Sequence, residues 1–204
     1  MKQWTPAFSL KYMTSHSDEF YLEKIQHRFD IFNVKEVCKS HFGAFKNIGF
    51  VADIGSGIMG GALAIFPYGS DRTIIDLNAP AYVESGKLPR GVIAFENDFD
   101  KLVLIDNSHD VVFSWECLDH ALTEDHFDQG QIELARILKP GGLLFFYLPL
   151  RDKPKDAHTI IRTEDEIIKK FEDLGLELKS KEIELDWNRY EKALYAIFEK
   201  SPLD

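Results

Sequence analysis

The stretch FVADIGSGIMGG, Phe50–Gly61, joins an apolar run of strand length to a glycine-rich turn. Its glycines at positions 55, 57 and 60 have the spacing G-x-G-x-x-G, and Asp53 stands two residues before the first of them. Glycine lets a backbone approach a ligand closely, and this spacing after a strand is typical of nucleotide-binding loops. The stretch therefore predicts a Rossmann-like α/β fold that binds its ligand at this turn.

The rest of the chain supports this fold class. Short apolar runs without polar alternation are separated by helical segments, which indicates a parallel sheet covered on both faces. We expect strands at 48–55, 72–78, 91–98, 109–118 and 143–150, a turn at 139–142, and helices at 17–46, 61–69, 124–138 and 163–175. Two final strands, 176–185 and 192–201, are joined by a link too short for a parallel crossover, so they are expected to be antiparallel.

Length and composition narrow the classes of function. A chain of 204 residues predicts one domain, with a helical cap over 1–46 and a core over 47–204. The net charge of -10 and the lack of a basic stripe argue against a nucleic-acid partner. No apolar run approaches the roughly 18 residues of a membrane span, so no membrane partner is expected. Cys38 and Cys117 have no metal-ligand spacing and predict free thiols in the cytoplasm.

Asp53 distinguishes between two kinds of cofactor. A dinucleotide places its pyrophosphate at the helix N-terminus, where this carboxylate would repel it. S-adenosylmethionine carries an ammonium and a sulfonium group, which a carboxylate attracts. Asp76 lies at the carboxyl end of the second expected strand, where an acid can accept the ribose hydroxyls. Asp98 closes the third expected strand, where it can accept the exocyclic amine of adenine beside Phe99.

These features occur together in a known order. The relevant segments are Asp53-x-Gly55-x-Gly57, Asp76, Asn97-Asp98, HDVVFSWECLDHAL at 109–122 and ILKPGGLLFF at 137–146. Over residues 45–200 the chain resembles the class I S-adenosylmethionine-dependent methyltransferases. It is most similar to their small-molecule, methyltransferase-domain-11-like branch, whose fourth-strand motif ends Leu-x-His, here Leu118-Asp119-His120. The resemblance implies a three-layer sandwich with a mostly parallel seven-stranded sheet, an antiparallel C-terminal hairpin and a short N-terminal helical cap.

The resemblance also implies a donor site and a reaction. The residues that it assigns to the donor are Asp53, Gly55, Ser56, Gly57, Asp76, Leu77, Asn97, Asp98, Phe99, Ser114 and Trp115. The reaction would be an in-line transfer of methyl to an oxygen or nitrogen atom of a small molecule, leaving S-adenosylhomocysteine. Such a transfer depends mainly on proximity and orientation, and we expect no metal.

The acceptor side has weaker signals. His120, His158 and Glu116 are candidates for a catalytic base, since each follows a strand at the edge where open α/β sheets bind ligands. Arg151 begins a basic loop that could bind an anionic acceptor, and Tyr12 and Tyr21 could cover the pocket. The pairs His109-Asp110 and Asp125-His126 are expected at the surface.

Two other functions stay open at this point. An NAD-dependent oxidoreductase would use the same glycine loop, although Asp53 and the terminal hairpin argue against it. A non-catalytic module that binds S-adenosylmethionine or a partner would carry the same donor motifs. Neither the acceptor nor the oligomeric state follows from the sequence.

Overall fold

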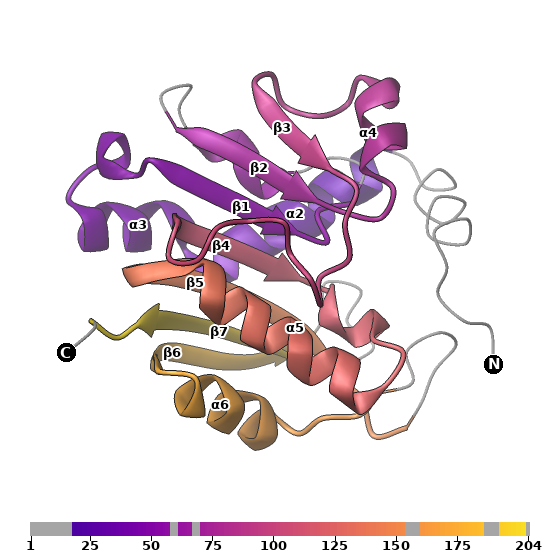
Figure 1. Ribbon diagram of the computed structural model, residues 1–204, viewed down its shortest axis with the longest axis vertical. Coiled ribbons are helices and arrows are strands. Elements are labelled where there is room, and N and C mark those ends of the chain that lie inside the picture. The colour runs from indigo at the N-terminus through magenta and orange to yellow at the C-terminus, as the bar shows by residue number, and fades with distance from the viewer. Residues whose placement is uncertain (1–17, 58–60, 67–69, 154–159, 186–191, 203–204) are drawn as a thin grey trace.

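The computed structural model describes residues 18–57, 61–66, 70–153, 160–185 and 192–202. Tyr12, His158 and the third motif glycine, Gly60, lie outside these residues. The described strands form one seven-stranded sheet in the order β3-β2-β1-β4-β5-β7-β6 (Figure 1). Their bounds are β1 Phe50–Ile54, β2 Asp71–Ile75, β3 Val92–Phe95, β4 His109–Trp115, β5 Leu138–Leu150, β6 Leu176–Leu185 and β7 Lys192–Lys200.

The pairing of the strands confirms the predicted sheet. Strands β1 to β5 are parallel to their neighbours, whereas β7 pairs antiparallel with both β5 and β6. The C-terminal hairpin predicted from the short link is therefore present, and β7 lies between β5 and β6. The fold is the Rossmann-like sandwich that the sequence predicted.

Helices cover both faces of the sheet and make the three layers (Figure 1). The described α-helices are α2 Asp18–Phe32, α3 Val34–Phe42, α4 Ala79–Ser85, α5 Glu124–Ile137 and α6 Glu164–Asp173; the 3-10 helices are η1 Phe45–Asn47, η2 Gly61–Ile65 and η3 Leu118–His120. One apolar cluster joins Ala52 of β1 to Phe127 of α5. The other joins Val51 to Phe32 of α2, so successive residues of β1 are buried on opposite faces.

Three local predictions were wrong. The helix expected over 17–46 is divided at Asn33, whose left-handed backbone (φ 47°) interrupts it. Of the predicted helix 61–69, the described residues 61–66 form only the short 3-10 helix η2. The turn expected at 139–142 lies inside β5 as an irregularity, because Leu138 pairs with His109 while Leu143 pairs with Val111. Helix α4, which the sequence patterns did not indicate, packs beside β3.

The topology determines where a ligand can bind. After β1 the chain builds β2 and β3 on one side of it, and then returns to place β4 and β5 on the other. Such a reversal opens a crevice beyond the carboxyl ends of the two central strands. The glycine loop follows β1, and Glu116 and Cys117 follow β4, so both segments meet at this point.

Candidate active site

The glycine loop packs tightly against the segment that follows β4. Gly55 and Gly57 both have left-handed backbones, with φ of 72° and 63°. A Cβ atom added at Gly55 would lie 2.6 Å from Cβ of Cys117, which is too close for any side chain. The N–H of Gly55 donates to the carbonyl of Ile75 at 2.8 Å. Glycine at position 55 is therefore required both by the backbone angle and by the close approach.

Asp76 ties the glycine loop to the end of β2. Its Oδ2 accepts from the N–H of Gly57 at 3.1 Å, and its Oδ1 accepts from the N–H of Asn78 at 2.9 Å. Burial raises the pKa of this carboxyl, while the two backbone donors and Tyr82 oppose the rise. A carboxylate oxygen can accept more than one hydrogen bond, so Asp76 retains capacity for the hydroxyls of a ribose.

Asp53 is a buried acid in the strand itself. It is 4% exposed, and burial raises its pKa to about 7. The charge of Arg28 and a hydrogen bond from the backbone of Ala62 lower this pKa, while the nearby Asp76 raises it. A cationic ligand beside Asp53 would stabilise the charged carboxylate, which fits the ammonium and sulfonium of the expected donor.

Glu116 lies in a cluster of buried charged side chains. We call this cluster the charged end, and its members are Lys24, Arg28, Asp53 and Glu116. The backbone of Glu116 is left-handed (φ 56°), which is uncommon for a residue other than glycine and is often found at functional sites. Its carboxylate pairs with Lys24 and with Nη2 of Arg28, the latter at 2.6 Å. Burial opposes the charge of Glu116, but the two cations hold its pKa below the usual range.

Helix α2 brings both cations to this place. Lys24 and Arg28 are four residues apart, so they share one face of the helix. They are only 8% and 5% exposed, and the guanidinium carbon of Arg28 lies 4.2 Å from the centre of the Tyr147 ring. Helix α2 thus places two positive charges beside Glu116, which directly follows β4, and one of them over Tyr147 of β5.

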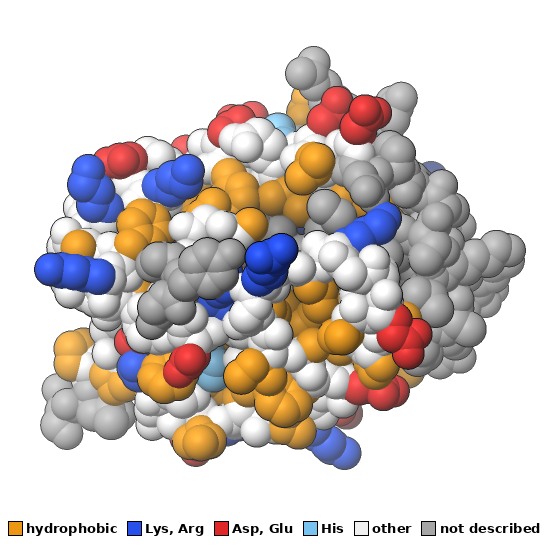
Figure 2. Space-filling view, turned by 90° about the horizontal axis from the view of Figure 1, so that it is seen from above, with side chains coloured by type: hydrophobic (Ala, Val, Ile, Leu, Met, Phe, Trp, Pro, Cys, Tyr) orange, Lys and Arg blue, Asp and Glu red, His pale blue; other side chains and the backbone are white. Residues whose placement is uncertain are grey.

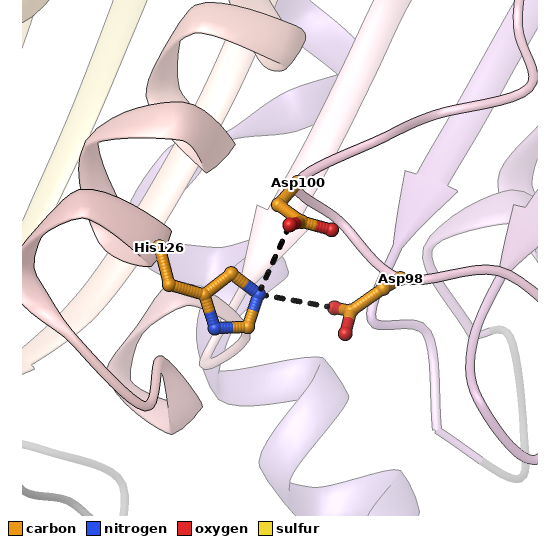
Figure 3. Close-up of side chains that lie close together, drawn as sticks. All are labelled: Asp98, Asp100 and His126. Carbon is orange, nitrogen blue, oxygen red and sulfur yellow. Dashed lines mark ion pairs between the residues drawn. The ribbon is translucent and has the colours of Figure 1, made fainter.

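A second group of side chains lies beyond the end of β3, and we call it the adenine edge: Asp98, Phe99, Asp100 and His126. The imidazole of His126, on α5, stacks on Phe99 with 4.4 Å between ring centres and 16° between planes. Its Nε2 lies 3.4 Å from Oδ1 of Asp98 and 4.0 Å from Oδ2 of Asp100 (Figure 3). The sequence placed His126 at the surface, but its side chain is only 14% exposed.

Asp98, Asp100 and His126 have ligand types that a cation could use, since one ligand atom from each lies within 4.8 Å of the others. The protonation of His126 favours a different role. Nδ1 accepts a hydrogen bond from the backbone N–H of Leu122 at 3.2 Å, so the proton of a neutral ring lies on Nε2. A protonated nitrogen has no lone pair for a metal ion, whereas it can donate to a carboxylate.

Other predicted donor residues lie around these two groups. Ser56 Oγ donates to the carbonyl of Gly57 at 3.2 Å, and Oδ1 of Asn97 accepts from the N–H of Val103 at 3.0 Å. Leu77, which follows Asp76, is partly exposed. Ser114 is 1% exposed, and its hydroxyl has no hydrogen-bond partner among the described residues.

Trp115 and the residues predicted to contact the methyl acceptor lie in different parts of the structure. Trp115 stacks on Phe32 of α2 at 5.6 Å, within the core on that face. Tyr21 packs with Tyr82 of α4, and Arg151 pairs with the buried Asp119 at 3.1 Å. His120 lies in η3, directly after β4.

The second expected surface histidine is also buried. His109, at the start of β4, is 5% exposed, and burial lowers its pKa to about 4. It lies at the opposite end of the strand from Trp115, away from the ligand-binding edge. The sequence did not single out Lys24, Arg28 or His126 as site residues. The four-residue spacing of Lys24 and Arg28 was the one available signal for the first two.

Comparisons with known proteins agree with the fold. Residues 52–146 match the family model described as a methyltransferase domain. A putative sarcosine dimethylglycine methyltransferase from Galdieria sulphuraria is similar in structure, with 15% identity, a TM-score of 0.62 and coverage of 83% of this chain and 86% of that one. A chain in the complex between the Haloferax volcanii Trm112 methyltransferase activator and the putative methyltransferase has 17% identity and a TM-score of 0.60, over 85% of this chain and 96% of that one.

The same fold occurs in a protein that is named for another reaction. The cyclase SpnF has 16% identity and a TM-score of 0.61, with 83% of this chain and 80% of that one covered. Comparison with curated proteins gives no match. Within the described part of the chain, no helix has the length and apolar character needed to cross a membrane.

Proposed function

We propose that this chain, which belongs to the class I S-adenosylmethionine-dependent methyltransferases, methylates an oxygen or nitrogen atom of a small, anionic molecule. The observation that carries the proposal is the meeting of two unlike groups at one edge of the sheet. Polar acceptors suited to adenosine follow β2 and β3, and buried charges lie beyond β1 and β4 under helix α2.

The residues at this edge fit the donor. Asp76 would accept the ribose hydroxyls, Asp98 the adenine amine, and the closely packed backbone at Gly55 and Gly57 would lie against the methionine part. Asp53 has a raised pKa that a cationic neighbour would lower, so binding would be coupled to its ionisation. When bound, the donor supplies an electrophilic methyl on a good leaving group, and the protein then contributes mainly orientation.

The charged end supports a small, anionic acceptor. Lys24 and Arg28 bring two positive charges to one carboxylate, Glu116. The charge of an ionised Asp53 would be matched by the cationic donor, which leaves one positive charge for an acceptor. Helix α2 lies over the ends of β4 and β5, so an acceptor would have to fit beneath or beside it. This cover favours a small molecule over a folded macromolecule.

The catalytic base is to be chosen among Glu116, His120 and His158. Glu116 is held in its charged form by two cations, so it is better suited to anchoring α2 than to taking a proton. We therefore favour His120, which follows β4 in η3, and we retain His158 as a candidate outside the described residues. Arg151 is engaged with Asp119, so we assign it to shaping the pocket wall.

The test is transfer of a labelled methyl group to a panel of carboxylates and phosphates, each paired with a neutral analogue. We expect turnover of an anionic member, and Lys24→Met should raise its KM about tenfold, the effect of losing one charge contact. The matched control, Lys169→Met, removes an exposed lysine of α6 and should change nothing. Turnover of neutral acceptors alone would contradict the anionic class.

Asp53→Ala and Asp76→Ala test the donor site. Both variants should remain folded and should lose donor binding.

A protein partner is the second candidate, either for a catalytic or a non-catalytic domain. Strand β3 is an edge strand, and Val83, Ile93 and Phe95 are 55%, 53% and 40% exposed near it. Figure 2 looks onto this end of the molecule and shows hydrophobic side chains exposed among charged ones. An open strand edge can accept a further strand, and one similar structure was solved with an activator protein. Light scattering of the purified chain would reveal self-association.

The same proposal extends to the domain organisation, the compartment and the partners of the chain. We propose a single domain over residues 1–204, acting in the cytoplasm without a nucleic-acid partner and without a metal. Cys38 and Cys117 are both buried and free, which supports a reducing compartment. An NAD-dependent oxidoreductase is disfavoured, because Asp53 would face the pyrophosphate of the dinucleotide.

A further inference from the structure

The ring of His126 is held in one orientation by contacts on two sides. Phe99 stacks on its face, and the N–H of Leu122 donates to Nδ1. Gly130, one turn further along α5, leaves room for the Phe99 ring, because a Cβ there would lie 2.8 Å from that ring. The ring therefore cannot rotate freely, and its Nε2 is directed toward Asp98 and Asp100 (Figure 3).

The Nε2 proton has one near acceptor. The atom is buried and makes no hydrogen bond to the described residues, and Oδ1 of Asp98, at 3.4 Å, is nearer than the closest oxygen of Asp100. A separation of 3.4 Å is slightly longer than a hydrogen bond, so a small rotation of Asp98 would complete it. Leaving a buried donor without an acceptor is costly, which favours this rotation.

The two oxygens of Asp98 thus have different surroundings. Oδ1 accepts the N–H of Phe99 at 2.8 Å and faces His126. Among the described residues, none donates to Oδ2. Holding Oδ1 from two directions would fix the plane of the carboxylate and leave Oδ2 as an acceptor for a ligand.

We infer that His126 is a positioning residue that fixes Asp98 so that the site selects adenine over hypoxanthine. The inference rests on the proposed function, in which Asp98 binds the adenine amine. An oriented carboxylate accepts a hydrogen bond from this amine. In hypoxanthine the amine is replaced by a carbonyl, whose oxygen would face the carboxylate and be repelled. His126 touches neither the donor nor the acceptor and acts only through Asp98.

The experiment compares binding of S-adenosylhomocysteine and S-inosylhomocysteine by calorimetry. We expect the wild-type chain to prefer the adenine compound by about 10- to 100-fold, the effect of one hydrogen bond to a charged group. Asp98→Asn should abolish this preference, because its amide can also donate to a carbonyl. If the wild type shows no preference, or if Asp98→Asn retains it, the assignment of Asp98 within the proposed function is wrong.

Two substitutions of His126 separate stacking from hydrogen bonding. His126→Phe keeps a ring on Phe99 but removes the Nε2 proton, so the preference should fall about five- to tenfold. His126→Gln keeps a donor near Nε2 and should retain the preference within about twofold. Wild-type preference in His126→Phe, together with loss of preference in Asp98→Asn, would overturn the role of His126 alone.

Further variants keep the test decisive if His126→Phe does not fold. Asp100→Asn removes the other carboxylate near Nε2 and should leave the preference unchanged or higher. A fall in this variant to the level of Asp98→Asn would overturn the inference, because Asp100 would then be the orienting group. Asp125→Asn, at an exposed neighbouring position of α5, is the control for changes in helix charge and should match the wild type.

Discussion

The charged end and the adenine edge lie at the same edge of the sheet but are stabilised differently. At the charged end, Lys24, Arg28, Asp53 and Glu116 are all largely withdrawn from water, and each charge depends on its neighbours. At the adenine edge, the carboxylate of Asp98 is 37% exposed, and the group is organised by ring stacking. A substitution that removes a charge should therefore destabilise the fold at the charged end, whereas at the adenine edge it should mainly alter ligand selection.

The largest effect should come from removing one partner of the buried ion cluster. Arg28→Met leaves Glu116 and Asp53 with less compensation, and we expect a loss of about 3–5 kcal/mol in the free energy of unfolding. Asp98→Asn should cost no more than about 1 kcal/mol, because its carboxylate is partly solvated. Urea denaturation of both variants measures the difference.

A double variant tests the cause of that loss. Adding Glu116→Gln to Arg28→Met removes a charge that would otherwise be buried with fewer partners, and should restore part of the lost stability. Equal stability losses for Arg28→Met and Asp98→Asn would contradict the difference between the two groups.

The next effect concerns the close packing of the glycine loop. Gly55→Ala places a Cβ against Cys117 and forces a left-handed alanine, which should cost about 2–4 kcal/mol. Gly86→Ala is the matched control, since Gly86 has a similar φ of 70° but no atom within 4 Å of the added Cβ. It should lose only about 1 kcal/mol in the same thermal melts. Similar losses of stability in the two variants would mean that Cys117 can move away from the added Cβ at no energetic cost.

Asp53 should show opposite effects on stability and binding. Its folded pKa of about 7 exceeds the unfolded value of 3.8, so its contribution is present at low pH and is lost as pH rises toward and through 7. Asp53→Asn has no such loss, and we expect it to be about 2 kcal/mol more stable than the wild type at pH 8.

The comparison at two pH values isolates this carboxyl. At pH 5 the folded side chain is mostly protonated while the unfolded one is still ionised, so the gain from Asp53→Asn should be clearly smaller than at pH 8 and should disappear only as the pH falls toward 3.8. Asp173→Asn removes an exposed acid of α6 and serves as the control in urea denaturation. A gain independent of pH would show that ionisation of Asp53 is not its source.

The smallest change in stability is expected at Gly130. Alanine favours the helix by about 1 kcal/mol, but its Cβ would meet the Phe99 ring, so the two effects should nearly cancel. Displacing Phe99 should nevertheless weaken S-adenosylhomocysteine binding about tenfold through Asp98 and His126. Calorimetry with a parallel thermal melt distinguishes these effects, and wild-type affinity would show that the position of Phe99 does not matter.

The sequence was sufficient for the sheet and for the positions of three acids near its strand ends. Asp53 lies near the end of β1, Asp76 directly follows β2 and Asp98 follows β3 after a short gap, and the carboxyl ends of parallel strands meet at one edge. Lys24 and Arg28 were missed because their burial depends on how α2 packs over β5, which a local pattern does not report.

The other missed features also depend on tertiary packing. The sequence pattern places His126 in a surface pair with Asp125, but its ring stacks on Phe99, in a loop from another part of the chain. The KPGG segment has turn composition, yet Gly141 accommodates the irregularity within β5. At the strand ends the parallel pairing itself predicts which residues meet, whereas no such rule predicts the partners of these positions.

The most direct test of the account is calorimetric titration of the wild-type chain with S-adenosylmethionine, S-adenosylhomocysteine and NADH in one buffer. We expect roughly micromolar binding of the first two compounds and no saturable binding of NADH. Saturable binding of NADH, with no heat from either adenosyl compound, would contradict it, because Asp53 would then lie beside a pyrophosphate rather than a cation.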